Sequence, residues 1–197
     1  MKNITILAFL LFAIASKAQS PIIDINESAM GQPDGYYIKD INNLLNPFEG
    51  TYVYTNGGTT FKVILVKKIQ QYNGRYYEDL IIGEYQFTQN YVEKVNTLAE
   101  INVIYNNQRI HKINGNDIVN NNFRMLKCPS CSPNEKRFHC SIKDPSTNRF
   151  ARMTMRRVTE GTQELMIITI SHPSRGNNDP SEPEFSLPLE EFTLVKE

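Results

Sequence analysis

Apolar and polar residues alternate with a period of two along most of the chain after Phe48, and this alternation predicts β-strands. Tight-turn sequences separate them, including Asn56-Gly57-Gly58, Asn73-Gly74 and Glu160-Gly161. We expect strands at 51–55, 59–70, 75–88, 137–143, 149–158, 164–171 and 191–196, and weaker ones at 91–98, 101–105, 109–113 and 123–127. The pattern therefore predicts an antiparallel meander of about ten short strands.

The segment before these strands has a different period. Ile38, Ile41, Leu44 and Leu45 recur at spacings of three and four, which predicts a short helix over 37–45 that ends at Pro47. Residues 19–36 are polar and rich in turn formers, so we expect an exposed N-terminal arm there. Residues 37–197 would then form a single β domain.

A long meander must hide its two edge strands, and closing into a barrel does so completely. We therefore predict an all-β, antiparallel up-and-down barrel of about eight to ten strands, with a two-sheet β-sandwich as the alternative. The residues expected to line the barrel interior are apolar or aromatic and share one face of their strands: Tyr52, Tyr54, Phe61, Ile81, Tyr85 and Phe87. They either form the core or contact a small apolar ligand.

One stretch resembles a known family. Asn46-Pro47-Phe48-Glu49-Gly50-Thr51-Tyr52-Val53-Tyr54 is similar to the start of the first strand in lipocalin-like (calycin) proteins, where a helical turn precedes Gly-x-Trp. Here Tyr52 stands in the place of that Trp. The longer block from Tyr36-Tyr37-Ile38-Lys39-Asp40 through Gly83-Glu84-Tyr85 resembles a family of uncharacterised exported bacterial proteins, a domain of unknown function. The resemblance implies a lipocalin-like barrel and brings no activity with it.

The first residues have the pattern of a secretory signal peptide. Lys2 is followed by an apolar stretch over 4–15 and then by Ser16-Lys17-Ala18, which predicts cleavage after Ala18. The apolar stretch is shorter than the roughly 20 residues that a spanning helix needs. We therefore expect export to the periplasm or medium, without a membrane span.

Three cysteines are candidates for a disulfide: Cys128, Cys131 and Cys140. In an oxidising compartment, one disulfide plus one thiol is expected, and the spacing leaves the pair undetermined. A bond from either of the first two to Cys140 would pin the loop to the following strand. Zinc would need His139 and Cys140 to converge on one ion, but neighbouring residues of a strand face opposite sides. We therefore predict no metal site.

Composition argues against several function classes. The chain has 21 basic and 21 acidic residues, and this balance argues against nucleic acid as a partner. No motif for an activated nucleophile or for cradling phosphate is present, so we predict neither an enzyme nor a cofactor. Glu78, Asp79 and Glu84 form an acidic cluster that could offer a carboxylate pair for sugar hydrolysis, but such residues are more often solvated strand edges or turn caps, which we expect here. The basic cluster Arg152, Arg156 and Arg157 has acidic residues nearby and is expected to lie on a solvated face.

Two hypotheses for function remain. The first is an exported lipocalin-like protein that binds a small apolar or amphipathic ligand in the barrel. The second is a non-catalytic interaction or structural protein of the envelope with a filled barrel, whose loops contact a protein or glycan. They differ in whether the barrel is hollow.

Overall fold

The computed structural model describes residues 20–120, 126, 128–173 and 184–197. The predicted signal peptide (1–18) and the expected strand at 123–127, apart from Leu126, lie outside the described residues. Within them the protein is all-β, and its helical parts are three short 3₁₀ turns. No helix in this part of the chain has the length and apolar character needed to span a membrane.

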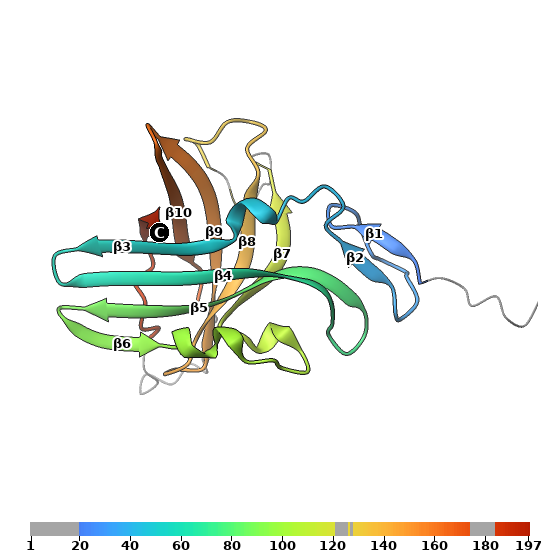
Figure 1. Cartoon of the computed structure of the whole chain (residues 1–197), viewed down its shortest axis with the longest axis horizontal. Helices are drawn as coiled ribbons and strands as arrows, with labels where there is room; N and C mark the ends of the chain where they lie inside the picture. The colour runs from blue at the N-terminus through green and yellow to red at the C-terminus, as the bar shows by residue number, and fades with distance from the viewer. Residues whose placement is uncertain (1–19, 121–125, 127, 174–183) are drawn as a thin grey trace, which may run out of the picture.

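Eight strands of the described chain form a closed antiparallel barrel in which each is paired with the next along the chain (Figure 1). They are β3 (Gly50–Asn56), β4 (Thr59–Tyr72), β5 (Tyr77–Gln89), β7 (Ile113–Val119), β8 (Arg137–Asp144), β9 (Arg149–Glu160), β10 (Gln163–Ser171) and β11 (Glu191–Lys196). The last strand pairs with the first through Val195–Val53 and Lys196–Tyr52, and this pairing closes the barrel. The predicted up-and-down barrel is confirmed, and it fits a lipocalin-like barrel. The sandwich alternative is wrong, because the two edges of the meander join.

Three further strands extend the sheet from β5. β1 (Ile22–Asp24) and β2 (Tyr37–Lys39) run parallel to each other, and β2 pairs with the start of β5. Figure 1 shows this pair to one side of the barrel, next to the curved ends of β4 and β5. β6 (Val92–Asn96) pairs with the other end of β5. The 3₁₀ turns are η1 (Asn46–Phe48), η2 (Leu98–Asn102) and η3 (Gln108–Ile110).

Gly83 stands where β5 meets both of its barrel neighbours. It pairs with Leu65 on β4 and with Ile113 on β7, and the register is continuous on both sides. A Cβ at this position would lie 2.7 Å from the Ile64 carbonyl oxygen and 3.2 Å from the Ile113 Cβ. The glycine therefore allows β4 and β7 to approach β5 closely from its two sides, rather than forming a bulge. The irregularity in β4 and β5 falls between Lys68 and Gln71.

The inward side chains form one packed core. Five of the six predicted lining residues are at most 1% exposed, and Tyr54 packs against the same cluster while partly buried. Phe61 lies edge-on to Tyr85 and Phe87, with ring centroids 6.0 and 6.1 Å apart. The Tyr52 hydroxyl donates to the Glu49 carbonyl over 3.2 Å, so this ring is buried with its polar tip satisfied.

The predicted helix over 37–45 is wrong. Its first residues form β2, and the following turn is held by Asp40, whose carboxylate accepts the backbone N–H groups of Leu44 and Leu45. A side chain that binds backbone donors locally competes with helical hydrogen bonding, and here the turn is favoured. Pro47 lies inside η1 instead of ending a longer helix. The N-terminal arm expected at 19–36 is only partly exposed, because Ile23 and Tyr36 are buried.

The weaker strand predictions had mixed outcomes. β6 confirms a strand within 91–98, whereas the segments at 101–105 and 109–113 contain parts of η2 and η3. β7 occupies the polar stretch Ile113–Val119, in which only some positions are buried. Polar residues occur in this strand because Asn114 donates its side-chain N–H to the His111 carbonyl, and Asp117 contacts His139.

Candidate functional site

The predicted acidic cluster does not face solvent. Glu78, Asp79 and Glu84 are 1%, 3% and 0% exposed. Residues 97–112, here called the β5 cover, supply the partners of Glu78 and Glu84, and residues 37–40 supply partners of Asp79. Glu78 binds Arg109 through two hydrogen bonds of 2.6 and 2.5 Å. Burial alone would lower the pKa of Arg109, and the contacts with Glu78 raise it overall. Buried carboxylates are tolerated when they are paired in this way.

The other two carboxylates anchor different segments. Asp79 accepts the Tyr37 hydroxyl (2.6 Å) and the backbone N–H of Asp40 (3.0 Å), so it fixes the N-terminal arm to β5. Glu84 Oε1 lies 2.7 Å from Nδ1 of His111, and both side chains are fully buried. These contacts assign the predicted acidic cluster a structural role.

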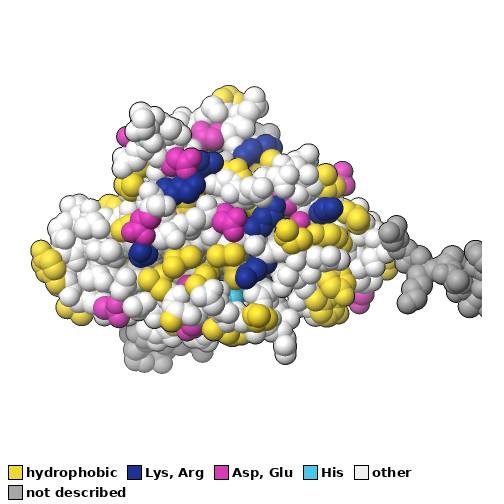
Figure 2. Space-filling model, viewed as in Figure 1, with side chains coloured by type: hydrophobic (Ala, Val, Ile, Leu, Met, Phe, Trp, Pro, Cys, Tyr) yellow, Lys and Arg dark blue, Asp and Glu magenta, His cyan; other side chains and the backbone are white. Residues whose placement is uncertain are grey.

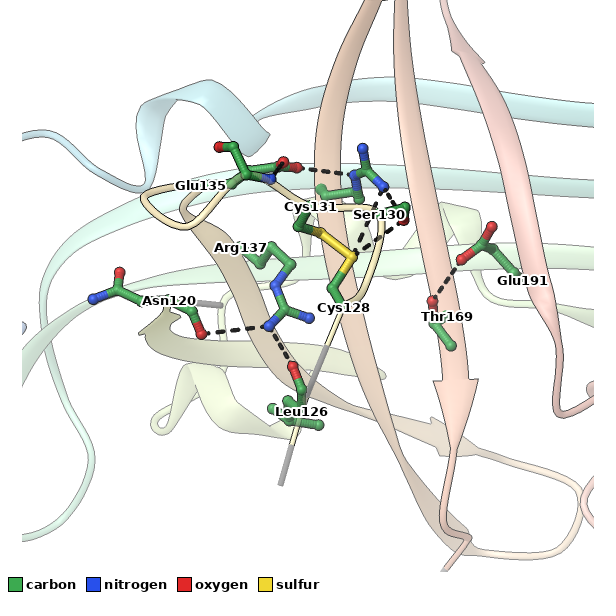
Figure 3. The surroundings of a disulfide bond; sticks show 11 residues. Asn120, Leu126, Cys128, Ser130, Cys131, Glu135, Arg137, Thr169 and Glu191 are labelled. Atoms are coloured by element: carbon green, nitrogen blue, oxygen red, sulfur yellow. Dashed lines mark hydrogen bonds and ion pairs between the residues drawn. A yellow bond between two sulfur atoms is a disulfide. The ribbon is translucent and has the colours of Figure 1, made fainter. Parts of the chain in front are cut away.

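A second covering segment lies on the opposite part of the barrel wall. Residues 126 and 128–136, here called the cysteine loop, lie against the outer faces of β8 and β9, and β10 borders the cleft beside them (Figure 3). Cys128 and Cys131 form a disulfide within this loop. Cys140 is a free thiol inside the barrel, where burial raises its pKa, so it does not pin the loop to β8. His139 faces the other side and contacts Asp117 over 3.1 Å, as the strand geometry predicts.

Two arginines hold the cysteine loop to the wall. Arg137 is 4% exposed, and its Nη2 donates to the carbonyl oxygens of Leu126 and Asn120 (Figure 3). Arg156 Nη1 donates to Ser130 Oγ over 3.0 Å, and its Nε lies 2.9 Å from Glu135 as an ion pair without an aligned hydrogen bond. The expectation that Arg156 lies on a solvated face is wrong, because the loop covers it.

The two arginines are neighbours across the β8–β9 pair. Phe138 pairs with Met155, so Arg137 before it and Arg156 after its partner lie side by side on the outer face. Burial lowers the pKa of Arg137; the attraction of Glu135 opposes this shift, whereas the like charge of Arg156 adds to it. Two guanidinium groups thus lie close together, and one carboxylate is in direct contact with one of them.

A cleft of about 300 Å3 lies between the cysteine loop and the strands. Its lining combines cations, hydroxyl groups and a few apolar side chains: Leu126, Cys128, Pro129, Ser130, Arg137, Thr154, Arg156, Ile167, Thr169, Ser171, His172 and Glu191. On its rim Glu191 accepts a hydrogen bond from Thr169 Oγ1 over 3.3 Å (Figure 3). The arrangement can position a small polar molecule against two arginines.

The predicted barrel-lining residues lie elsewhere. Tyr52, Tyr54, Phe61, Ile81, Tyr85 and Phe87 come together in the core and do not contribute to this cleft. The other described clefts are more open to solvent: one of about 740 Å3 at the β9–β10 hairpin, one of about 550 Å3 at 184–189 and one of about 240 Å3 beside β7. On the face shown in Figure 2, Lys and Arg side chains are interspersed with Asp and Glu.

Sequence reasoning missed Arg137 and misplaced Arg156. Both positions follow from strand parity, since they alternate with the inward residues Phe138 and Met155. Parity predicts an outward side chain but not whether another segment covers it. The Cys-Pro-Ser-Cys sequence could have indicated their burial. Its disulfide holds residues 128–131 in a tight loop a few residues before β8, where the loop can cover outward side chains.

The fold and the cleft define a filled β-barrel protein with a cleft on its outer wall. The chain matches over residues 1–197 the model of a family of unknown function, DUF6705, and it belongs to that family. No curated protein and no solved structure matches it significantly.

Proposed function

We propose that this protein is an exported, non-catalytic binding protein of the cell envelope, in which the filled barrel is a rigid scaffold and the cleft under the cysteine loop is the contact site. One observation carries the proposal. The inward aromatic rings pack against one another in a single core, whereas about 300 Å3 of open volume lies outside the wall, bordered by polar groups. Small-molecule sites have volumes of about 300 Å3 upward with a few convergent polar groups.

Native mass spectrometry of the protein purified from its own host tests the site. A ligand held in the cleft gives a retained mass that Thr169→Trp abolishes, because this residue lines the cleft and faces it from β10. Thr193→Trp is the matched control, since Thr193 is exposed on neighbouring β11 and lies outside the cleft lining. A retained mass that survives Thr169→Trp would contradict the proposal.

The same experiment distinguishes the alternative of an apolar ligand inside the barrel. Such a ligand would have to displace rings such as Phe61, Tyr85 and Phe87, which are fully buried against each other. It would appear as an apolar retained mass that is present in both tryptophan variants. Loss of that mass on overpacking the interior, for example in Val63→Phe, would locate it there.

Export is part of the proposal and has its own test. Residues 1–18 have the charge and apolar pattern of a signal peptide, and the disulfide fits an oxidising compartment. The intact mass of the protein recovered from the periplasm or medium should correspond to a chain that begins at Gln19. Recovery of the uncleaved chain from the cytoplasm would contradict export.

A further inference from the structure

Arg137 is a buried cation that forms no ion pair within the described part of the chain. Its side chain lies beneath the cysteine loop, and the described residues provide it with two carbonyl acceptors but no carboxylate in ion-pair contact. Its Nε is buried and has no hydrogen-bond partner among the residues that the structure describes. A buried charge is costly unless it is paired, so an arginine left in this state next to an open cleft is a site for a counter-ion.

The neighbouring charges strengthen the need of Arg137 for a counter-ion. Arg156 lies beside Arg137 and is engaged by Glu135, which therefore neutralises one of the two guanidinium groups. Glu191 lines the cleft from β11, where it accepts a hydrogen bond from Thr169. The cleft thus has a cationic end at Arg137 and a carboxylate at its rim.

Hydroxyl groups complete the lining between these two ends. Thr154, Thr169 and Ser171 face the cleft from β9 and β10, and Ser130 faces it from the loop. Hydroxyl groups both donate and accept hydrogen bonds, so they can bind the oxygens of an anion or the hydroxyls of a sugar. A guanidinium group favours planar, two-point contact with carboxylate, phosphate or sulfate.

We propose that the cleft binds a small polar molecule through one oxyanion group, a carboxylate, phosphate or sulfate, with Arg137 as its counter-ion and Arg156 beside it. Glu191 at the rim would accept hydroxyl donors of the same molecule and would repel a second anionic group. This inference rests on the proposed function, because it names the ligand class of the same cleft.

Titration calorimetry on the full exported chain tests the inference. The probes are sodium glucuronate, glucose as its uncharged counterpart, sodium sulfate and sodium phosphate, all at one ionic strength set with sodium chloride. We expect glucuronate or the inorganic oxyanions to bind at least tenfold more tightly than glucose. Binding of glucuronate alone assigns a carboxylate ligand, and binding of sulfate or phosphate assigns a tetrahedral one.

Variants locate the interaction. Arg137→Met should weaken oxyanion binding at least tenfold, whereas Arg152→Met, an exposed arginine on β9 outside the cleft lining, should change it less than twofold. Thr169→Trp leaves both arginines in place and should abolish binding by filling the cleft, so the test holds even where Arg137→Met does not fold.

The two proposals fail in different ways. The oxyanion inference is overturned if glucose binds as tightly as glucuronate, or if Arg137→Met leaves binding unchanged. In either case the proposed function still stands, provided that Thr169→Trp blocks binding in the cleft. The absence of binding by every oxyanion probe overturns the oxyanion inference as well. A host-derived mass that persists in Thr169→Trp overturns the proposed function itself.

Discussion

The outer barrel wall is covered in two places, and the two covers use opposite chemistry. The β5 cover is held by buried carboxylates such as Glu78, which binds Arg109 with both oxygens. The cysteine loop is held by the buried Arg137 and the partly buried Arg156, and Arg137 lacks a carboxylate in contact among the described residues. Under the β5 cover the apolar residues Leu80 and Ile82 are buried, whereas the cysteine loop leaves a cleft. A covering segment can therefore complete a fold or enclose a binding site, and the difference lies in whether its buried charges are paired.

The largest expected effect on the free energy of unfolding comes from breaking the ion pair between Glu78 and Arg109 under the β5 cover. Glu78→Ala leaves Arg109, whose side chain is 32% exposed, without its carboxylate partner. The loss should therefore lie at the lower end of the about 3–5 kcal/mol that removing one member of a buried ion pair costs. Urea unfolding should show this loss in the free energy of unfolding. Glu160→Ala, at an exposed hairpin position, should stay within about 0.5 kcal/mol. A loss below about 1 kcal/mol in Glu78→Ala would contradict the structural role of the carboxylate.

The next effect concerns the disulfide of the cysteine loop. Replacing both Cys128 and Cys131 with Ser removes a bond that closes only a short segment, so the chain-entropy contribution lost is at most about 2 kcal/mol. Hydrogen exchange should become faster in 128–136 and remain unchanged in the β5 cover. Faster exchange in both segments would show that the two covers are coupled.

A smaller effect on stability is expected from Arg137→Met. The gain from removing an uncompensated buried charge opposes the loss of the hydrogen bonds to Leu126 and Asn120, so the free energy of unfolding should stay within about 1 kcal/mol of the wild type. The contrast with Glu78→Ala is the central test of the comparison. Destabilisation of both variants to the same extent, measured by urea unfolding, would show that Arg137 is structural.

The smallest effect is a change in pH dependence. The hydrogen bond from Lys112 lowers the pKa of Glu100 in the β5 cover. A carboxyl whose pKa is lowered by folding stabilises the native state above its unfolded pKa and loses that contribution as the pH falls through its folded pKa. Glu100→Gln should therefore remove about 0.5 kcal/mol at neutral pH and nothing at strongly acidic pH. Unfolding curves that differ equally at both extremes would contradict this linkage.

Much of the barrel could be predicted because its signal is local. The alternation of Phe61, Val63 and Leu65 with more polar neighbours fixes which face of β4 is inward, and glycine-containing turns fix where the strands reverse. The predicted helix over 37–45 has the apolar spacing of a helix but does not form. The hydrogen bonds of Asp40 and the pairing of β2 with β5 stabilise a strand and a turn there instead. The periodicity of residues 37–45 carries no information about β5, the partner strand, which lies about forty residues further along the chain.

The candidate site could not be predicted in the same way. Arg137 and Arg156 read as ordinary outward residues of two strands, and the acidic residues of β5 read as solvated. By itself the sequence determined an all-β chain, its turns and the aromatic face of its strands, since these depend on neighbours within a few residues. Only the tertiary structure decided that Cys128 pairs with Cys131, that rings fill the barrel, and that loops bury charges outside it. Burial of an outward side chain depends on which distant segment covers it, and that requires the whole chain to be folded.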